Sequence, residues 1–432
     1  MHRPPRHPHR LTGLCAAAVA LLPACGNDTG IFPGYDGSAP PPTGTAVDAA
    51  SDSAGTATPT GVVVLNSDYS SCSVSFLDRD GNLLLDGCLN SGSGGPGLAM
   101  ALSGDVVLPT QVPAGGPVAI IDRTNTAITW LDAATCAVRG QLAVGTGFAS
   151  NPHDVVTLSA SKAYVTREAG NSKPTPAAGD FDDGNDVLII DPARLEIVGR
   201  IDLLPFAPAG VLPRADRALL AQGKVFVSLN AVSADYASYG TGRIVIIDPD
   251  RDQVTGTIDL PGVQNCGAMT YVAAAQRLLV ACNGAYGDPA AQAAGSAIVA
   301  IDLAQTPPVV VAQVAATAAG NVPLSNLTVA AVDGTTALGV AVGAFGGTPP
   351  DSLWSLPLGD GVPAKVFDST EGFVIGAVLY DQDRHRMLAA DGTMNTAAYL
   401  RVFDQAAGGF GAGRTVATNP TQKLPPRALS FY

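Results

Sequence analysis

The amino-acid sequence predicts an all-β fold, a seven-bladed β-propeller built from four-stranded blades. The first observation is a repeat: residues 188–203 and 245–260 align without a gap, and nine of these sixteen positions are identical. The second is a regularly placed acid, with gaps of 54, 59, 57, 54 and then 102 residues between Asp78, Asp132, Asp191, Asp248, Asp302 and Asp404. The third is that the two ends look like complementary parts of one unit. A repeat of this length is typical of arrays of small sheets.

Each repeat divides into four short apolar runs, named A to D in chain order. In the third repeat they are His153–Leu158, Lys162–Arg167, Asp186–Asp191 and Glu196–Leu203. The runs are rich in β-branched residues and are bounded by Gly, Pro, Asn or Asp, the pattern of strands and turns. The regular acid closes each C run, with Pro357 near the matching place in the sixth repeat. Four such strands in about 50 residues indicate one propeller blade.

The ends of residues 61–432 predict how the ring closes. This part opens at Gly61–Asn66 with a B-type run and ends at 426–431 with an A-type run, similar to Pro213-Arg214-Ala215. We therefore expect the C-terminal strand to complete the first blade, which leaves no open sheet edge. A pair of β-sandwiches is the alternative fold, but the regular spacing favours the propeller.

The N-terminus resembles a bacterial export signal. Three arginines precede a short apolar stretch, 11–22, that is too short to span a membrane as a mature helix. Residues 22–26, Leu-Pro-Ala-Cys-Gly, resemble a lipobox, the site where lipoproteins are diacylated on the Cys and cleaved before it. Residues 1–24 are therefore predicted to be a lipoprotein signal peptide and Cys25 to be lipidated. An ordinary secretory signal with a chance Cys is the alternative.

Residues 25–60 are predicted to be a flexible tether that starts at Cys25. They are rich in Gly, Ala, Pro, Ser, Thr and Asp, a composition that cannot bury enough apolar surface to fold. About 35 such residues reach roughly 30 Å. The expected location is the bacterial cell envelope, lipid-anchored to the outer membrane on its periplasmic or surface face, because Gly26 is compatible with outer-membrane sorting.

The charge of the chain limits its partners. Removal of residues 1–24 takes three of the 24 basic residues and none of the 37 acidic ones, so 21 minus 37 leaves a net charge of −16. This acidity argues against nucleic acid and against direct docking on anionic lipid. The expected partners are an envelope protein, a peptide or a glycan, with membrane contact through the lipid anchor only.

Four of the five cysteines after Cys25 form two pairs, each sixteen residues apart. In each pair the residues stand at the open end of a predicted hairpin, where they would lie within bridging distance. We therefore predict the disulfides Cys72–Cys88 and Cys266–Cys282, which an exported protein can keep. Buried free thiols are the alternative. Cys136 is left over and is expected to be an unpaired turn residue.

The segment Lys162-Ala-Tyr-Val-Thr166, followed by Val187-Leu-Ile-Ile-Asp-Pro192, resembles the YVTN-type propeller repeat. The resemblance covers about residues 61–432 and is strongest in the third to fifth repeats. It implies blade structure and carries no catalytic residue. Members of such families include surface-layer and periplasmic binding proteins and lactonase-like enzymes. The sequence matches no lactonase active-site pattern residue by residue.

The sequence also excludes several chemistries. After residue 24 only His153 and His385 remain, so one chain cannot build a three-His zinc or multi-His copper site. It has no Cys-x-x-Cys-His haem motif, Gly-x-Ser-x-Gly elbow, P-loop or Rossmann fingerprint. Any enzyme activity would have to use carboxylates, arginines or a bound divalent ion.

A ligand site is predicted at the mouth of the central channel. In a propeller the B–C loops and the D–A connections emerge on one face, and long loops on a rigid scaffold are common binding sites. The long insertions are predicted to be B–C loops at 109–127, 168–185, 231–242, 284–296 and 344–351. The predicted ligand residues are His153, Asp154, Arg167, Arg214, Asp216, Asn230, Asn283 and Arg427. The alternative is that these side chains join blade to blade.

The loop 180–186 is strongly acidic, which suits calcium. Its candidate ligands are Asp180, Asp182, Asp183 and Asp186. The spacing differs from an EF-hand, and a solvated turn is the alternative; calcium is the one cofactor that the sequence suggests. Tyr236 and Tyr239 could stack on a sugar or peptide, or could pack their loop down.

The sequence thus favours a membrane-tethered binding or scaffold protein of the cell envelope for a protein, peptide or glycan. The alternative is a lactonase-like or other hydrolase with its site at the channel mouth. That alternative requires His153, Asp154, Arg214 and Arg427 to converge on one point.

Overall fold

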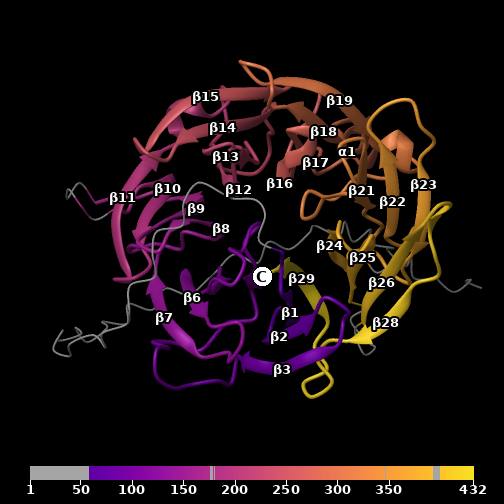
Figure 1. Cartoon of the computed structure of the whole chain (residues 1–432). Coiled ribbons are helices and arrows are strands. Elements are labelled where there is room, and N and C mark those ends of the chain that lie inside the picture. The colour runs from indigo at the N-terminus through magenta and orange to yellow at the C-terminus, as the bar shows by residue number, and fades with distance from the viewer. Residues whose placement is uncertain (1–57, 176–178, 180, 346, 393–398) are drawn as a thin grey trace, which may run out of the picture. The chain divides into compact units, whose positions relative to one another are not determined.

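Seven antiparallel sheets lie in a ring, so the predicted seven-bladed β-propeller is confirmed (Figure 1). The structure is a computed structural model that describes residues 58–432 apart from 176–178, 180, 346 and 393–398. The predicted signal peptide, Cys25 and residues 25–57 of the predicted tether lie outside the described residues. Within the described part of the chain, no helix is long and apolar enough to cross a membrane.

Each blade runs from an inner strand A to an outer strand D. Blade 1 holds β29 (Pro426–Phe431), β1 (Gly61–Ser67), β2 (Cys72–Asp78) and β3 (Leu83–Asn90). Blade 2 holds β4 (Val106–Val107), β5 (Val118–Asp122), β6 (Ala127–Leu131) and β7 (Val138–Ala143). Blade 3 holds β8 (Pro152–Ser159), β9 (Lys162–Gly170), β10 (Gly184–Asp191) and β11 (Glu196–Asp202). Blade 4 holds β12 (Ala215–Ala221), β13 (Lys224–Leu229), β14 (Gly242–Asp248) and β15 (Gln253–Leu260).

The remaining blades follow the same order. Blade 5 holds β16 (Cys266–Val272), β17 (Arg277–Asn283), β18 (Ser296–Asp302) and β19 (Val309–Ala315). Blade 6 holds β20 (Ala330–Ala331), β21 (Thr336–Ala341), β22 (Ser352–Pro357) and β23 (Ala364–Asp368). Blade 7 holds β24 (Ile375–Asp381), β25 (Arg386–Asp391), β26 (Tyr399–Ala406) and β28 (Arg414–Ala417), with the short β27 (Gly409–Phe410) on β26. The described helices are α1 (Pro289–Ala294) and the 3-10 turns η1 (Leu204–Phe206), η2 (Ala273–Ala275) and η3 (Ala316–Ala319).

Burial explains the sequence pattern of the strands. The B and C strands lie between neighbouring blades and are buried on both faces. Their sequences are therefore continuous apolar runs, as in β10. The D strands face solvent on one side and alternate, as in β15. The core therefore consists of apolar layers between adjacent blades, such as Leu188 and Ile190 of β10 packed with Ile128 and Trp130 of β6.

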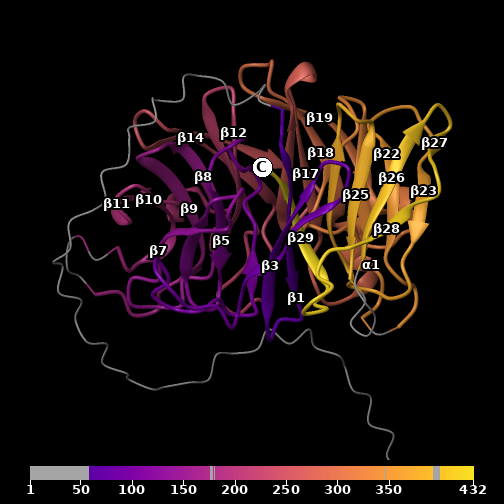
Figure 2. The ribbon, with the colours of Figure 1, turned by 60° about the horizontal axis from the view of Figure 1, so that its bottom comes forward.

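The ring closes through the C-terminal strand, as predicted. β29 pairs with β1 in the register Val64↔Leu429, although the two strands come from opposite ends of the sequence (Figures 1 and 2). Thr60 N donates to Tyr432 O (2.7 Å), Tyr432 N donates to Gly61 O (3.2 Å), and the Tyr432 ring packs edge-on against Phe76. The edge of β1 is thereby covered, which protects it from pairing with another chain.

The two faces of the ring differ in their connections. We call the face with the B–C loops and D–A connections the loop face, and the face with the A–B and C–D turns the turn face. The insertions at 168–185, 231–242, 284–296 and 344–351 join B to C strands, as predicted. The prediction for 109–127 is wrong, because this segment follows β4 and mostly joins A to B. The A strand β4 has only two residues and was not recognised in the sequence. The insertion after it was therefore assigned to the end of a B strand.

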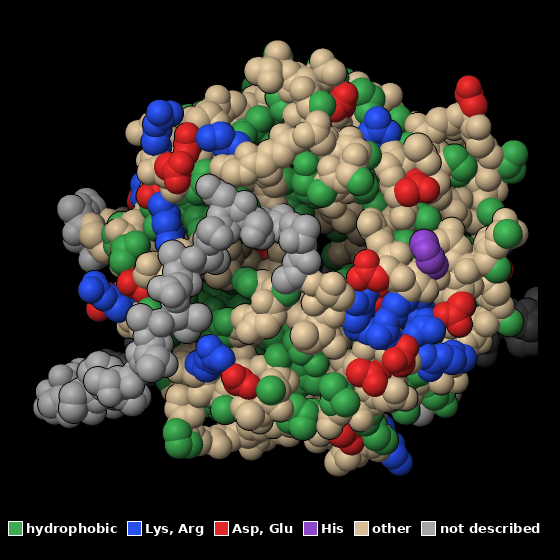
Figure 3. Space-filling view, viewed as in Figure 1, with side chains coloured by type: hydrophobic (Ala, Val, Ile, Leu, Met, Phe, Trp, Pro, Cys, Tyr) green, Lys and Arg blue, Asp and Glu red, His purple; other side chains and the backbone are tan. Residues whose placement is uncertain are grey.

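Ion pairs on the turn face join blade 1 to blade 7. Arg79 Nε donates to Asp381 Oδ2 (2.7 Å), and both side chains are buried. Arg384 Nη1 and Arg386 Nη1 lie 2.5 and 3.2 Å from Asp80 Oδ1. Figure 3 shows Lys, Arg, Asp and Glu side chains gathered over this part of the ring.

The disulfide prediction holds for one pair and is wrong for the other. Cys266 and Cys282 are register partners and form a disulfide. Cys88 instead bonds Cys136, and Cys72 is a buried free thiol, so neither the predicted Cys72–Cys88 bridge nor the unpaired Cys136 occurs. The reason is the register between strands β2 and β3. β3 bulges twice against β2, which moves the partner of Ser73 to Asn90.

These bulges place Cys72 opposite Ser91, whose Oγ accepts from Cys72 N (2.8 Å). Cys88 then reaches the neighbouring blade, where Cys136 lies in the β6–β7 turn with a Cα–Cα distance of 6.2 Å. The bond therefore joins blade 1 to blade 2.

Candidate functional site

Three neighbouring blades present the same turn at the channel mouth. Asn151, Arg214 and Asn265 each precede an A strand with a left-handed backbone, at φ of 47°, 51° and 54°. In each blade the carbonyl of this residue accepts from the backbone N–H at the end of the B strand, at 3.1, 3.0 and 3.1 Å for Glu168, Asn230 and Asn283. The repeat therefore brings equivalent polar positions of blades 3, 4 and 5 to one edge of the channel.

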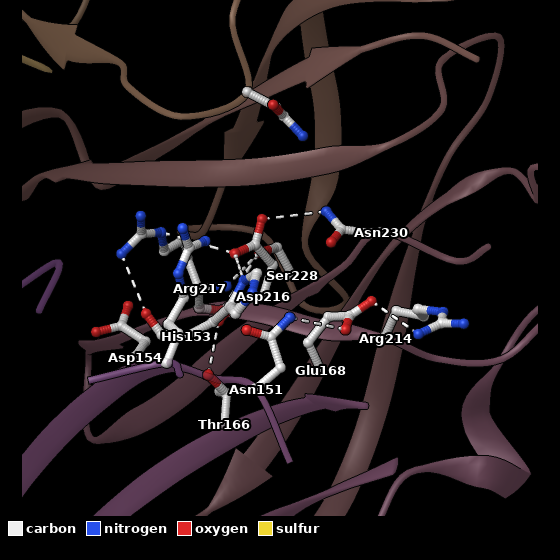
Figure 4. A network of polar contacts seen from close by, with 12 residues as sticks. Asn151, His153, Asp154, Thr166, Glu168, Arg214, Asp216, Arg217, Ser228 and Asn230 are labelled. Carbon is white, nitrogen blue, oxygen red and sulfur yellow. Dashed lines mark hydrogen bonds and ion pairs between the residues drawn. The ribbon is translucent and has the colours of Figure 1, made fainter. Parts of the chain in front are cut away.

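His153 and Asp216 form a buried pair between blades 3 and 4 (Figure 4). His153 Nδ1 lies 2.7 Å from Asp216 Oδ1, and Asn230 Nδ2 donates to Asp216 Oδ2 (3.1 Å). The Asp216 carboxylate thus orients the imidazole ring through Nδ1. Nε2 is buried and has no hydrogen-bond partner.

The charge of Asp216 is stabilised by its neighbours. Burial raises the pKa of this carboxyl, but His153 and Arg217 favour the charged form more strongly, and the pKa ends below its usual value. Arg217 Nε lies 3.7 Å from Asp216 Oδ1, and its Nη1 donates to His153 O (3.2 Å). Sequence reasoning missed Arg217, although it directly follows Asp216 in the chain.

Asp154 has a different role from the adjacent His153. Its carboxylate accepts from Thr110 N (3.0 Å), Thr110 Oγ1 (2.5 Å) and Ala218 N (2.9 Å), so it joins blades 2, 3 and 4. The side chain is fully buried, and this burial raises its pKa. Asp154 therefore joins blade to blade, which was the alternative for this group of residues.

A segment of blade 2 crosses the inner strands of blades 3 and 4. Beside Thr110, Gln111 exchanges two hydrogen bonds with the backbone of Leu220 on β12, at 3.2 and 2.8 Å. Arg217 Nη1 donates to Leu108 O (3.1 Å). These contacts come from the segment directly after β4, where the prediction of a B–C loop is wrong, and no local sequence pattern indicates them.

Arg214 belongs to a second network beside the His153 pair. Its Nη1 donates to Glu168 Oε1 (2.9 Å) and to the Tyr236 hydroxyl (2.7 Å), and Asn151 Nδ2 donates to Glu168 Oε2 (3.0 Å). The guanidinium lies 4.0 Å from the centre of the Tyr236 ring. The loop that carries Tyr236 is thereby held against blade 4.

The other predicted ligand residues lie in separate contacts. Asn283 Nδ2 donates to Leu324 O (2.6 Å), which joins blades 5 and 6. Arg427 contacts Ser67 O (3.2 Å) and Phe373 O (3.3 Å) where blades 7 and 1 meet. The structure therefore brings together His153, Asp216 and Asn230 and places the rest in different networks. Whether they bind a ligand stays a prediction.

Arg167 is fully buried beneath the acidic loop. It contacts both carboxylate oxygens of Asp186 at 2.8 and 2.7 Å and donates to Phe181 O (2.6 Å). Asp183 pairs with Arg200 (2.8 Å), and Asp182 accepts from Thr175 N (2.7 Å), a bond that holds its pKa below the usual range.

No group of three or more His, Cys, Asp or Glu is placed to hold a metal among the described residues. Asp180 lies outside them, so calcium binding stays a prediction. A depression of about 530 Å³ lies beside this loop, lined by Thr146, Gly147, Asn171, Lys173, Thr175 and Asp182.

The loop face also carries the exposed aromatic side chains of the described residues. They are Tyr69 (59% exposed), Tyr236 (42%), Tyr286 (49%), Phe345 (75%), Phe373 (43%) and Tyr399 (37%). Phe373 lies in a D–A connection; the others lie in B–C loops or directly follow one. Sequence reasoning identified only Tyr236 of these six, because exposure depends on how each loop folds back.

Comparisons with known proteins give the fold and no family. No family model matches the sequence, and no curated protein matches it. The structure is similar to a 6-phosphogluconolactonase-like protein from Bacteroides uniformis, with a TM-score of 0.55 and 12% identity over 86% of this chain and 100% of that one. A second such protein, from Bacteroides fragilis, has a TM-score of 0.54 and 10% identity over 86% and 98%.

A hypothetical selenium-binding protein from Sulfolobus tokodaii has a TM-score of 0.55 and 9% identity over 87% of this chain and 94% of that one. At such identities the likeness shows the propeller fold alone.

Proposed function

We propose that this protein is a lipid-anchored binding protein of the bacterial cell envelope and that its loop face binds the ligand. The observation that carries the proposal is that, within the described part of the chain, the six exposed aromatic side chains all lie on this face. Exposed aromatic rings are costly to leave in water and are enriched where proteins bind partners.

The opposite face is unlike a ligand site. Its exposed side chains include Asp80, Asp383 and Asp404, which pair with arginines of the same face. The chain enters the propeller at Gly61, and β1 runs from the turn face to the loop face. The tether proposed to start at Cys25 would therefore enter the propeller on its turn face.

The test is retention of the purified chain, residues 26–432, on envelope fractions of the source bacterium. Phe345→Ser and Tyr286→Ser are expected to lower retention, because each removes an exposed ring without emptying the core. Val198→Ser is the matched control, since Val198 is 54% exposed but lies on the outer strand β11. Equal retention of all four proteins would contradict the proposal.

A lactonase-like or other hydrolase is a second candidate. Asp154, Arg214 and Arg427 do not converge on His153 as that prediction required, and the one observation that favours it is the unpartnered Nε2 of His153. An imidazole oriented by a carboxylate can serve as a general base. Two of the similar structures are 6-phosphogluconolactonase-like proteins, which supports a sugar lactone as the first substrate to try. His153→Gln should abolish such turnover, whereas His385→Gln, on the β24–β25 turn, should not. Absence of turnover by the unmodified chain would remove this candidate.

A further inference from the structure

The exposed aromatic residues follow the repeat of the fold. Five consecutive blades each carry one at the B–C connection: Tyr236 in blade 4, Tyr286 in blade 5, Phe345 in blade 6, Tyr399 in blade 7 and Tyr69 in blade 1. Because each blade repeats the same unit turned about the ring axis, these residues lie along an arc on the loop face. We call these five residues the aromatic arc.

Four rings of the aromatic arc are held by a neighbouring side chain. Arg214 lies 4.0 Å from the Tyr236 ring centre, and Arg427 lies 5.3 Å from that of Tyr69. Tyr239 packs edge-on against Tyr286 at 6.3 Å, and Phe373 packs edge-on against Phe345 at 6.0 Å. Rings that are fixed in place yet remain exposed lose little conformational freedom when a ligand stacks on them.

We propose that the aromatic arc binds an extended, uncharged glycan chain, with sugar rings stacked on successive aromatic side chains. This inference rests on the proposed binding function of the loop face. An arc spread over five blades suits a polymer, since a compact ligand could contact only one or two of its rings.

The charge of the chain and the arrangement of the aromatic residues indicate which class of polymer binds. Exposed aromatic platforms bind chains of flat rings, as in single-stranded nucleic-acid binding, but that ligand also needs a positive groove. A mature chain with 21 basic and 37 acidic groups repels a polyanion. Peptides are usually held by strand edges, grooves or arginine clusters. The inner edges of the blades face the channel, and the arc residues are single side chains at the B–C connections of five separate blades. Of the ring-containing or extended polymers considered, an uncharged glycan is the one that these arguments favour.

The test uses a soluble, uncharged β-glucan separated into a disaccharide fraction and a long-strand fraction. The chain 26–432 should bind long strands at least about tenfold more tightly than the disaccharide, because several stacking contacts act together. Tyr236→Ser and Tyr69→Ser, at the two ends of the arc, should each weaken long-strand binding roughly tenfold.

Phe345→Ser, in the middle of the arc, should weaken long-strand binding most, since it leaves only short stretches of arc on either side. Val198→Ser should bind like the unmodified chain. Circular dichroism melting shows whether each variant folds, and all of them change exposed residues.

Binding that does not depend on strand length, or that survives all three aromatic variants, would overturn the inference. Failure to bind any strand, with aromatic-dependent retention on protein-containing envelope fractions, would also overturn it while leaving the proposed function intact. Loss of aromatic dependence in both assays would overturn both.

Discussion

Burial separates polar residues that look equivalent in the sequence. Asp154 and His153 are neighbours in the chain, yet the Asp154 carboxylate is saturated by donors from blades 2 and 4, while His153 keeps one unpaired ring nitrogen. Both were predicted because they begin an A strand. The direction of each side chain depends on contacts with other blades, and no local pattern encodes those contacts.

Gly267 is required by the His153 pair. It occupies in blade 5 the position that Asp216 occupies in blade 4, and a Cβ there would lie 2.5 Å from both Asp216 Oδ2 and the backbone oxygen of Asn326. We expect Gly267→Ala to lower the free energy of unfolding by about 1–3 kcal/mol through overpacking. Urea denaturation measures this. Gly359→Ala is the control, because nothing lies within 4 Å of its Cβ; equal effects of the two changes would contradict the argument.

The Cys72 thiol is expected to be inert in the folded protein. Burial raises its pKa to about 11, so at pH 8 nearly all of it is the unreactive protonated form. Iodoacetamide should therefore label Cys72 only after unfolding without reductant, as read by mass spectrometry. The same digests should contain a peptide pair linked through Cys88 and Cys136. A linked Cys72–Cys88 pair would show that the register of β3 is wrong.

At the scale of elements, the sequence predicted strands better than register. The four runs of the third repeat match β8 to β11 within three residues at each end, because β-branched runs and turn residues are local signals. The bulges of β3 leave no such signal, so Cys88 was assigned to the wrong partner. The two-residue strand β4 likewise hid the segment that crosses blades 3 and 4. Only the Cys266–Cys282 hairpin kept the register needed for its predicted bridge.

The buried pair of Arg79 and Asp381 is one of the contacts that join blades 1 and 7. Arg79 is 9% and Asp381 is 1% exposed at the side chain. Arg79→Leu would leave the Asp381 carboxylate buried without its cation, and we expect a loss of about 3–5 kcal/mol in the free energy of unfolding. Arg194→Ala removes a pair in which the arginine is 73% exposed and should cost less than about 1 kcal/mol. Similar midpoints in urea for both variants would refute this difference.

At the scale of the whole molecule, the repeat predicts the ring but not its ligand. Spacing and complementary ends are properties of every blade, so they sufficed for seven blades and for closure by the last strand. Ligand recognition depends on what differs between blades. The aromatic arc consists of single Tyr or Phe residues in loops of unrelated sequence, and their common position becomes visible only when the blades are superimposed by the fold.

Closure by β29 should make the whole ring depend on the last residues of the chain. Deletion of residues 425–432 removes the strand that pairs with Val62–Leu65 and exposes the edge of β1, which is then free to pair with another chain. We expect the shortened chain to melt at a lower temperature and to elute as dimers or larger species in size-exclusion chromatography. A synthetic peptide of residues 424–432 should restore the monomer and raise the melting temperature, because it can reoccupy the vacant edge. A shortened chain that stays monomeric with an unchanged melting temperature would show that the first blade is stable without its inner strand.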